Sequence, residues 1–328
     1  MEKDIILDVH NLCVEFNTRD GIARVINGFG FQLSQGNTLG IVGESGCGKT
    51  MTALAIMGLV PSPPGRVADG RILLDDEDLV QANEERLCEV RGKEISMIFQ
   101  EPMTSLNPVF SVGNQIVETL QRHEGLPRRT AWDRAVEMLR AVGIPAPERR
   151  VKDYPHQMSG GMRQRVMIAM ALACQPKILI ADEPTTALDV TVQAQIFDLL
   201  RQLQEQTKSA IILITHDVGV IAEMAKRVIV MYAGYKVEEG PVDVILQSPK
   251  HPYTQGLIAC IPSLQADPDP ARPPLDEIPG IVPALTELGM GCPFSPRCAE
   301  AMPKCGKEAP PLKETTTGHV AACWLLNS

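Results

Sequence analysis

The sequence predicts an α/β fold in which helices cover both faces of a mostly parallel sheet. Short apolar runs typical of buried strands, at 178–181 and 210–215, alternate with helical segments such as 191–206. A glycine-rich loop joins the apolar run 39–42 to a helical segment at 51–57. Of the 328 residues, 44% are hydrophobic, which is enough for one large domain and a smaller appendage.

Composition disfavours several classes of protein. A formal net charge of −9 and an aromatic content of 4% argue against nucleic acid as a partner. No apolar run approaches the roughly 18 residues that span a bilayer, and the first residues do not resemble a signal peptide. We therefore expect a cytoplasmic protein that reaches a membrane only through a partner. Its nine cysteines are then expected as thiols or metal ligands rather than disulfides.

The N-terminal part of the chain predicts a small antiparallel layer. Strand-like segments at 5–14, 29–33 and 38–42 are separated by turn residues and lead to the glycine-rich loop. The proline-rich segment 61–70 predicts a turn, followed by a strand at 71–74.

The middle of the chain predicts a helical subdomain from 101 to about 175. Apolar residues recur at helical spacing in 112–122 and 130–142. A closing hairpin is expected at 227–231 and 236–239.

A change of composition after residue 247 predicts a domain boundary. Residues 1–247 then form the main domain and residues 248–328 a C-terminal extension rich in proline. Residues 263–278 are expected to be a loop or linker. The extension also contains four cysteines, Cys292, Cys298, Cys305 and Cys323.

The glycine-rich loop at 43–50 fits the phosphate-binding pattern G-x-x-x-x-G-K-[ST] between a strand and a helix. Its backbone N–H groups can converge on an anion, and the helix N-terminus adds roughly half a positive charge. Lys49 can reach the β- and γ-phosphates, and Thr50 can bind Mg²⁺. The expected nucleotide contacts are Gly43, Glu44, Ser45, Gly46, Cys47, Gly48, Lys49, Thr50 and Met51.

Two acids end the buried strand at 177–183. Asp182 is expected to hold Mg²⁺ directly or through water, and Glu183 to polarise the attacking water. Taken alone, the pair could equally be a solvated acidic turn.

Further segments follow in a fixed order: Gln100, 158–165 with the sequence Met-Ser-Gly-Gly-Met-Arg-Gln-Arg, Ala-Leu-Asp at 187–189, and Ile-Thr-His-Asp at 214–217. Together with the loop and the acids, this set resembles the ATP-binding subunit of an ABC transporter over residues 4 to about 245. The resemblance implies an ABC-type P-loop NTPase, with a RecA-like mixed sheet, an antiparallel β layer and a helical subdomain, plus a small cysteine-rich C-terminal appendage. It also implies ATP hydrolysis with Mg²⁺.

The resemblance implies a role for each matching residue. Gln100 would join the metal and the attacking water to the membrane subunit, and His216 would orient that water with Glu183. Asp189 would lie across an ATPase dimer interface. The Mg²⁺ ligands would be Thr50, Gln100 and Asp182. The signature loop, which would bind the γ-phosphate of ATP held by the opposite subunit, would consist of Ser159, Gly160 and Gly161.

The sequence departs from the family pattern in two places. Met158 and Met162 replace the leucine and glutamine that usually flank the signature, so the glutamine's hydrogen bonds are missing. No aromatic residue stands where the family usually stacks one on adenine. We therefore expect an aliphatic contact from Ile22, Ala23 or Val25.

Segments outside the ATPase motifs resemble peptide importers. These are 100–108, 251–257, 279–283 and 291–298, and the pattern is most similar to the D-type ATPase of bacterial dipeptide/oligopeptide importers. The resemblance implies a second ABC ATPase subunit, favoured as a paralogue, two transmembrane permease subunits and an extracytoplasmic peptide-binding protein. It implies a peripheral position at the cytoplasmic face of the inner membrane.

Two alternatives stay open at this point. A related nickel or antimicrobial-peptide importer shares the C-terminal extension. A soluble, non-transport ABC ATPase is disfavoured, because the chain has neither a coiled-coil insertion nor a second cassette.

The spacing of the four C-terminal cysteines, with 5, 6 and 17 intervening residues, matches neither common zinc ribbons nor ferredoxins. Four cytoplasmic thiolates could hold a [4Fe–4S] cluster or Zn²⁺, or could remain free. A small extension that buries little apolar surface would be stabilised by a metal site that links its segments. Resemblance to peptide-importer relatives favours the [4Fe–4S] cluster.

Overall fold

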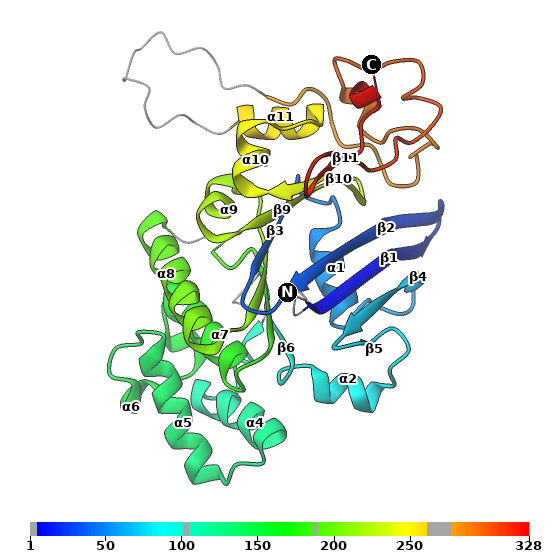
Figure 1. Ribbon diagram of the computed structural model, residues 1–328. Helices are drawn as coiled ribbons and strands as arrows, with labels where there is room; N and C mark the ends of the chain where they lie inside the picture. Colours follow the sequence, from blue (N-terminus) through cyan, green and yellow to red (C-terminus); the bar gives the residue numbers. More distant parts are fainter. Residues whose placement is uncertain (1–4, 101–104, 186–188, 261–276, 328) are drawn as a thin grey trace, which may run out of the picture. The chain divides into compact units, whose positions relative to one another are not determined.

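The computed structural model describes residues 5–100, 105–185, 189–260 and 277–327 (Figure 1). The chain divides into two compact units. The first unit contains Met1–Ile6, Leu33–Thr38 and Gln81–Ile214; the second contains Leu7–Gln32, Leu39–Val80 and Thr215–Ser328.

The first unit has a core of three parallel strands. β6 (Ile95–Ile98) pairs with β7 (Ile178–Asp182), and β7 pairs with β8 (Ala210–Ile214). Every residue of the three strands is buried, which explains why all but Ser96 and Asp182 are apolar. The apolar runs at 178–181 and 210–215 predicted β7 and β8 to within one residue at each end, because a strand buried on both faces is mostly apolar.

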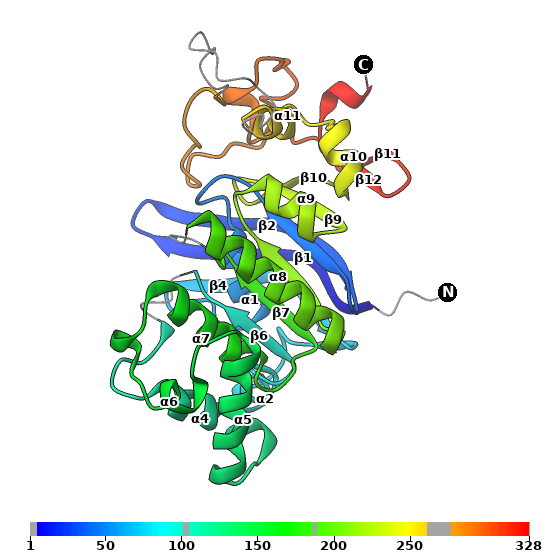
Figure 2. The same ribbon diagram turned by 90° about the vertical axis from the view of Figure 1, so that its left-hand side faces the viewer.

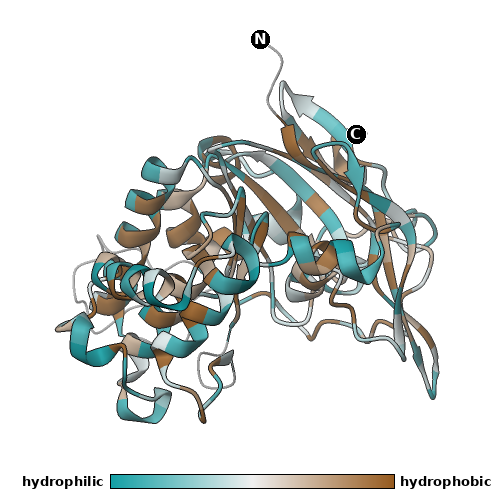
Figure 3. Ribbon diagram, turned by 90° about the horizontal axis from the view of Figure 1, so that it is seen from below, coloured by the Kyte–Doolittle hydropathy of each residue, from teal (hydrophilic) through white to brown (hydrophobic). Residues whose placement is uncertain are grey.

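Helices make up the rest of the first unit. α4, α5 and α7 lie together in both views (Figures 1 and 2), and α8 follows β7 in the chain. In Figure 3 the helices carry both brown and teal residues, as expected for helices with one apolar face. The predicted helical subdomain is present between β6 and β7. It contains α4 (Val112–Glu124), α5 (Arg128–Ala141), α6 (Pro147–Arg150), the 3-10 turn η1 (Pro155–Gln157) and α7 (Gly160–Leu172). In the chain, α2 (Glu84–Val90) precedes β6 and α8 (Val190–Thr207) follows β7.

The second unit contains an antiparallel layer of order β2-β1-β4-β5. Its strands are β1 (Ile5–Thr18), β2 (Gly21–Ser34), β4 (Gly65–Leu74) and β5 (Glu77–Asp78). The predicted turn over 61–70 is wrong in its second half, because β4 starts at Gly65. Phe16 of β1 pairs with Gly65, and Val14 pairs with Val67. This long-range pairing overrides the local turn signal.

This unit also contains five neighbouring strands of a mixed sheet, in the order β11-β12-β10-β9-β3. β3 (Thr38–Val42) is parallel to β9 (Arg227–Tyr232), and β9 forms the predicted antiparallel hairpin with β10 (Tyr235–Pro241). The hairpin does not close the sheet. β12 (His319–Ala321) adds to β10, and β11 (Lys313–Thr316) adds to β12.

The second unit's helices are short. They are α1 (Lys49–Ile56), α9 (Val218–Met224), α10 (Val242–Gln247), α11 (Pro252–Ala259) and the 3-10 turns η2 (Ser295–Arg297) and η3 (Trp324–Asn327). Most of the predicted linker at 263–278 lies outside the described residues. The boundary at 247/248 stays a prediction, although β12 gives the C-terminal extension a strand in the second unit's sheet. Within the part of the chain that the structure describes, no helix is long and apolar enough to cross a membrane.

Candidate nucleotide-binding site

The phosphate loop connects β3 to α1 in a conformation that requires glycine. The φ angles of Gly43, Gly46 and Gly48 are +155°, +79° and +107°. A Cβ atom on Gly43 would lie 2.3 Å from the Met231 carbonyl oxygen, and one on Gly48 would lie 2.9 Å from that of Val25. Backbone handedness and close approach therefore both exclude larger residues at the two ends of this loop.

Lys49 lies buried beneath the loop, with 5% of its surface exposed. Its Nζ donates to the carbonyl oxygens of Gly43 at 2.7 Å and Glu44 at 3.1 Å. Among the described residues, the N–H groups of Ser45 and Gly46 have no hydrogen-bond partner. A buried ammonium and open N–H groups at a helix N-terminus suit a polyphosphate.

Two further residues of the loop behave differently. Thr50 is exposed at the first turn of α1, as a hydroxyl ligand of a cation needs to be. Cys47 is buried, and this burial raises the pKa of its thiol, so it acts as a small packing residue.

In the first unit, Gln100 and Glu183 are brought together. Nε2 of Gln100 donates to Oε2 of Glu183 at 3.0 Å. Glu183 has a φ of +45°, and its N–H donates to the Ile214 carbonyl oxygen at 2.9 Å. Its neighbour Asp182 is 1% exposed at the end of β7. A non-glycine residue in the left-handed region costs free energy, so the surrounding structure must hold Glu183 there.

The predicted signature loop stands at the N-terminus of α7. Oγ of Ser159 accepts the Met162 N–H at 3.3 Å and so caps the helix. Ser159 and Gly160 are exposed, and a Cβ atom on Gly160 would meet nothing within 4 Å. The start of α8 lies beside it, since a Cβ atom on Gly161 would approach Val192 to 3.3 Å.

The remaining predicted residues have simpler surroundings. Asp189 caps α8 by accepting the Val192 N–H at 3.0 Å. His216 is exposed between β8 and α9. Of the candidates for adenine contact, Ile22 is 56% exposed and Ala23 is buried. Residues 101–104 and 187–188, which belong to predicted motifs, lie outside the described residues.

Two loop contacts were missed by sequence reasoning. The Glu44 N–H donates to the Tyr253 hydroxyl at 2.9 Å, and the Glu44 carboxylate binds the Arg297 guanidinium at 2.6 Å. Both partners lie in segments that marked the subfamily, 251–257 and 291–298. Their residue types alone give no sign that they reach the phosphate loop.

The four C-terminal cysteines line one small cavity together with His251 and Phe294. Burial raises the pKa of the Cys292 thiol to about 11 and also raises those of Cys298 and Cys323. Within the described ranges, no group of three or more histidine, cysteine or acidic side chains is arranged to hold a metal ion. The donor set suits a soft metal, and the structure carries the four cysteines as free cysteines without a disulfide.

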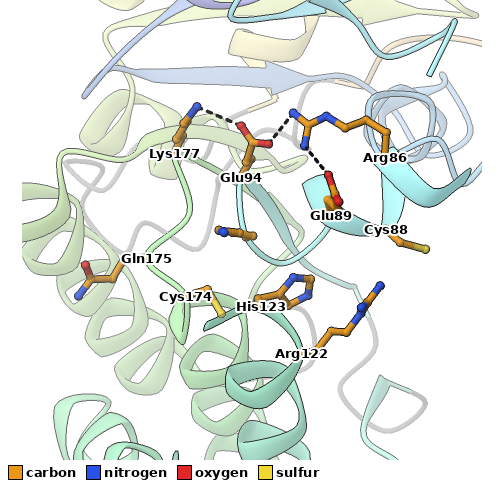
Figure 4. A pocket seen from close by; sticks show the side chains of 10 residues that line it. Arg86, Cys88, Glu89, Glu94, Arg122, His123, Cys174, Gln175 and Lys177 are labelled. Atoms are coloured by element: carbon orange, nitrogen blue, oxygen red, sulfur yellow. Dashed lines mark hydrogen bonds and ion pairs between the residues drawn. The ribbon is translucent and has the colours of Figure 1, made fainter. Parts of the chain in front are cut away.

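A larger cavity of about 700 Å³ lies at the N-terminal ends of β6 and β7 (Figure 4). Arg86 and Lys177 both point at Glu94, at 2.7 and 3.0 Å. Burial acts to raise the pKa of Glu94, but the two cations outweigh it and the pKa is lowered. Glu94 and Lys177 precede β6 and β7, whereas Gln100 and Glu183 follow them. Since the strands are parallel, this cavity is not part of the predicted nucleotide site.

Comparisons with known proteins give matches over most of the chain. The ABC transporter family model matches residues 26–186, and the model for the C-terminal region of oligopeptide/dipeptide transporters matches residues 237–305. The oligopeptide transport ATP-binding protein OppD of Bacillus subtilis is 51% identical over 322 residues, covering 98% of this chain and 89% of that protein. The dipeptide transport ATP-binding protein DppD of the same species is 48% identical over 325 residues, covering 99% and 95%.

Solved structures confirm the predicted fold. The ATP-binding cassette MJ0796, in a dimeric post-hydrolysis state bound to ADP and Pi, superposes with a TM-score of 0.65 at 26% identity, covering 72% of this chain and 98% of that one. The structure of cbiO1 from Clostridium perfringens gives 0.63 at 28% identity, covering 75% and 93%. The chain therefore belongs to the ABC transporter family, as an ATP-binding subunit that hydrolyses ATP.

Proposed function

We propose that this ATPase energises the import of di- and oligopeptides across the cytoplasmic membrane. One observation carries the proposal: similarity to peptide-transport ATP-binding proteins continues through the C-terminal extension, where the oligopeptide/dipeptide transporter model matches. The working assembly contains a second ABC ATPase subunit, a paralogue, with two permease subunits and an extracytoplasmic peptide-binding protein. The chain then sits peripherally at the cytoplasmic face of the inner membrane.

The phosphate loop binds the nucleotide in this proposal. The Lys49 ammonium leaves the carbonyl oxygens of Gly43 and Glu44 and binds the β- and γ-phosphates instead. The N–H groups of the loop donate to phosphate oxygens as well. Hydroxyl, amide and carboxylate oxygens suit Mg²⁺, so Thr50, Gln100 and Asp182 are its proposed ligands. When bound, Mg²⁺ neutralises charge on the β- and γ-phosphate oxygens.

Glu183 is the proposed general base. Its carboxylate orients the attacking water and takes up a proton from it. His216 contacts the γ-phosphate and orients the same water. The hydrogen bond from Gln100 holds the Glu183 carboxylate, so contact between Gln100 and the membrane subunit would act on Glu183 through this bond. Nucleotide state and membrane contact are linked through this pair.

The signature loop acts on the nucleotide of the facing subunit. Ser159 and Gly160 are exposed at the start of a 13-residue helix, so their N–H groups and the helix dipole can approach an anion from outside the chain. Two ATP molecules are then enclosed between two ATPase subunits, with Asp189 at their interface.

The test is reconstitution of the complete transporter. The chain is purified from detergent-solubilised membranes with its partners and placed in proteoliposomes with the binding protein. ATP hydrolysis should rise with di- or oligopeptides and should not rise with Ni²⁺ alone. Stimulation by Ni²⁺ alone would instead identify a nickel importer, and a chain that purifies without permeases would contradict a transport role. Mass spectrometry of the complex decides between a paralogue and a second copy.

The cysteines carry a finer proposal, in which Cys292, Cys298, Cys305 and Cys323 bind a [4Fe–4S] cluster, with Zn²⁺ as the alternative. Support comes from the single cavity that the four side chains line. Binding requires these thiols to lose their protons. Anaerobic purification, an absorption spectrum and iron and zinc analysis test it, with Cys305→Ser as the variant that should lose the metal. A colourless preparation free of both metals contradicts it.

A further inference from the structure

We propose that Arg297 is a positioning residue for the phosphate loop, through which the C-terminal extension sets the affinity for ATP. The proposal rests on the nucleotide role of residues 43–50. It concerns one contact that neither the ATPase motifs nor the extension would reveal separately: the ion pair between Arg297 and Glu44.

The pair has the geometry of a strong and specific interaction. Nη1 of Arg297 lies 2.6 Å from Oε2 of Glu44, and Nη2 lies 3.0 Å from Oε1. The Arg297 side chain is 4% exposed and that of Glu44 is 28% exposed. Two parallel charge-assisted hydrogen bonds fix both distance and orientation, which a lysine cannot reproduce.

The guanidinium is fixed from the other side by the extension and by β9. Its Nε donates to the Pro279 carbonyl oxygen at 2.8 Å, and Nη2 donates to that of Ile278 at 3.1 Å. Its central carbon lies 5.8 Å from the centre of the Tyr232 ring and 6.0 Å from that of Phe294. Arg297 is therefore held in place by its surroundings and is not a surface charge that happens to meet an acid.

The contact continues to the phosphate-binding lysine. The Glu44 carbonyl oxygen accepts from Nζ of Lys49, and the Glu44 N–H donates to the Tyr253 hydroxyl. The side chain, N–H and carbonyl of Glu44 are thus all engaged. A shift of Glu44 would therefore change the position of the Lys49 ammonium before the nucleotide binds.

Charge gives a second reason for the pair. Glu44 belongs to the loop that receives a polyphosphate, and a carboxylate there would repel it if it were unpaired. Arg297 neutralises this carboxylate. Removing the arginine should therefore harm ATP binding more than removing both partners.

The experiment uses the complete transporter in proteoliposomes and compares Arg297→Met, Glu44→Gln and the double variant. Arg297→Met keeps much of the apolar stem and loses the charge. We expect it to raise KM for ATP roughly tenfold, as for a lost charge-assisted pair, with kcat changed about twofold or less. The double variant should recover most of that KM, because no unpaired carboxylate remains.

Arg297→Lys and Lys304→Met complete the design. Arg297→Lys should give an intermediate KM, because lysine keeps the positive charge but cannot make both parallel hydrogen bonds of the guanidinium. Lys304→Met is the matched control: it removes a cation from the same extension that contacts Trp324 rather than the loop, and KM should not change. If Arg297→Met does not assemble, Arg297→Lys and Glu44→Gln still test the proposal through KM.

Several results would overturn it. KM of assembled Arg297→Met equal to the wild type, a fall in kcat alone, or additive effects in the double variant would each do so. Lys49→Ala distinguishes failure of the positioning role of Arg297 from failure of the proposed nucleotide site. If Lys49→Ala still binds ATP, the phosphate site itself is wrong; if it loses ATP while Arg297→Met is unaffected, only the positioning role fails.

Discussion

The phosphate loop and the signature loop both place glycines before a helix, yet their glycines are there for different reasons. In the phosphate loop, Gly43 and Gly48 have positive φ angles and lie against the main chain of Met231 and Val25. In the signature loop, Gly160 has no positive φ, and a Cβ atom there would meet nothing within 4 Å. The chain's own fold requires the first pair, whereas the described residues give no steric reason for Gly160. The difference supports a signature loop shaped for a ligand held by another subunit.

The largest expected effect tests whether the two loops still bind ATP when ATP hydrolysis is blocked. Glu183→Gln should lower ATP hydrolysis by about 10²–10⁴-fold, because the proposed general base is lost. ATP binding and ATP-dependent pairing of the subunits should persist, since neither loop changes. Single-turnover hydrolysis and size-exclusion chromatography with ATP measure the two. Full turnover in this variant would remove Glu183 from the mechanism.

The next effect concerns the fold of the phosphate loop. Gly43→Ala should lower the free energy of unfolding by about 2–3 kcal/mol and abolish ATP binding, because the new methyl group meets the main chain of Met231. Gly46→Ala is the matched control. Gly46 also has a positive φ, but its Cβ atom would meet nothing within 4 Å, so it should cost only about 1 kcal/mol. Urea unfolding and a fluorescent ATP analogue measure both, and equal losses would contradict the steric explanation.

A smaller effect is expected at the signature loop, and it should appear only in the assembly. Gly160→Ala should change the free energy of unfolding by less than about 0.5 kcal/mol, since the position is open. Hydrolysis by the assembled ATPase should nevertheless fall roughly tenfold or more, because the methyl group would block the proposed approach of a phosphate to the helix N-terminus. A loss of stability without loss of activity would show that Gly160 serves the chain's own fold.

The last expected effect concerns stability alone, and it is a pH dependence that comes from His251, beside the phosphate-loop partner Tyr253. His251 is 1% exposed and accepts the Tyr253 N–H through Nδ1 at 3.1 Å. Burial lowers its pKa to about 4, so between pH 6.5 and 4 the unfolded chain binds a proton that the folded chain does not. Stability should therefore fall with falling pH, by about 2 kcal/mol from pH 7 to 5. Urea unfolding should show a smaller fall in His251→Asn, which keeps an acceptor at this helix cap; an unchanged slope would contradict the assignment.

The two units also differ in how far sequence alone could predict them. In the first unit, β7, β8, α4 and α8 follow from apolar runs and helical periodicity, which are local signals. The hydrogen bond between Gln100 and Glu183 joins two residues that the motifs had already named. In the second unit, the start of β4 at Gly65 was missed, because its pairing with β1 outweighs a proline-rich turn signal.

The sequence by itself determined the order of the ATPase motifs and the family, because each motif consists of contiguous residues. Only the tertiary structure decided that β12 extends the sheet of β10 and that Tyr253 and Arg297 reach Glu44. These contacts span 209 and 253 residues of chain. Neither leaves a periodic pattern, since burial and charge complementarity arise only once distant segments pack together.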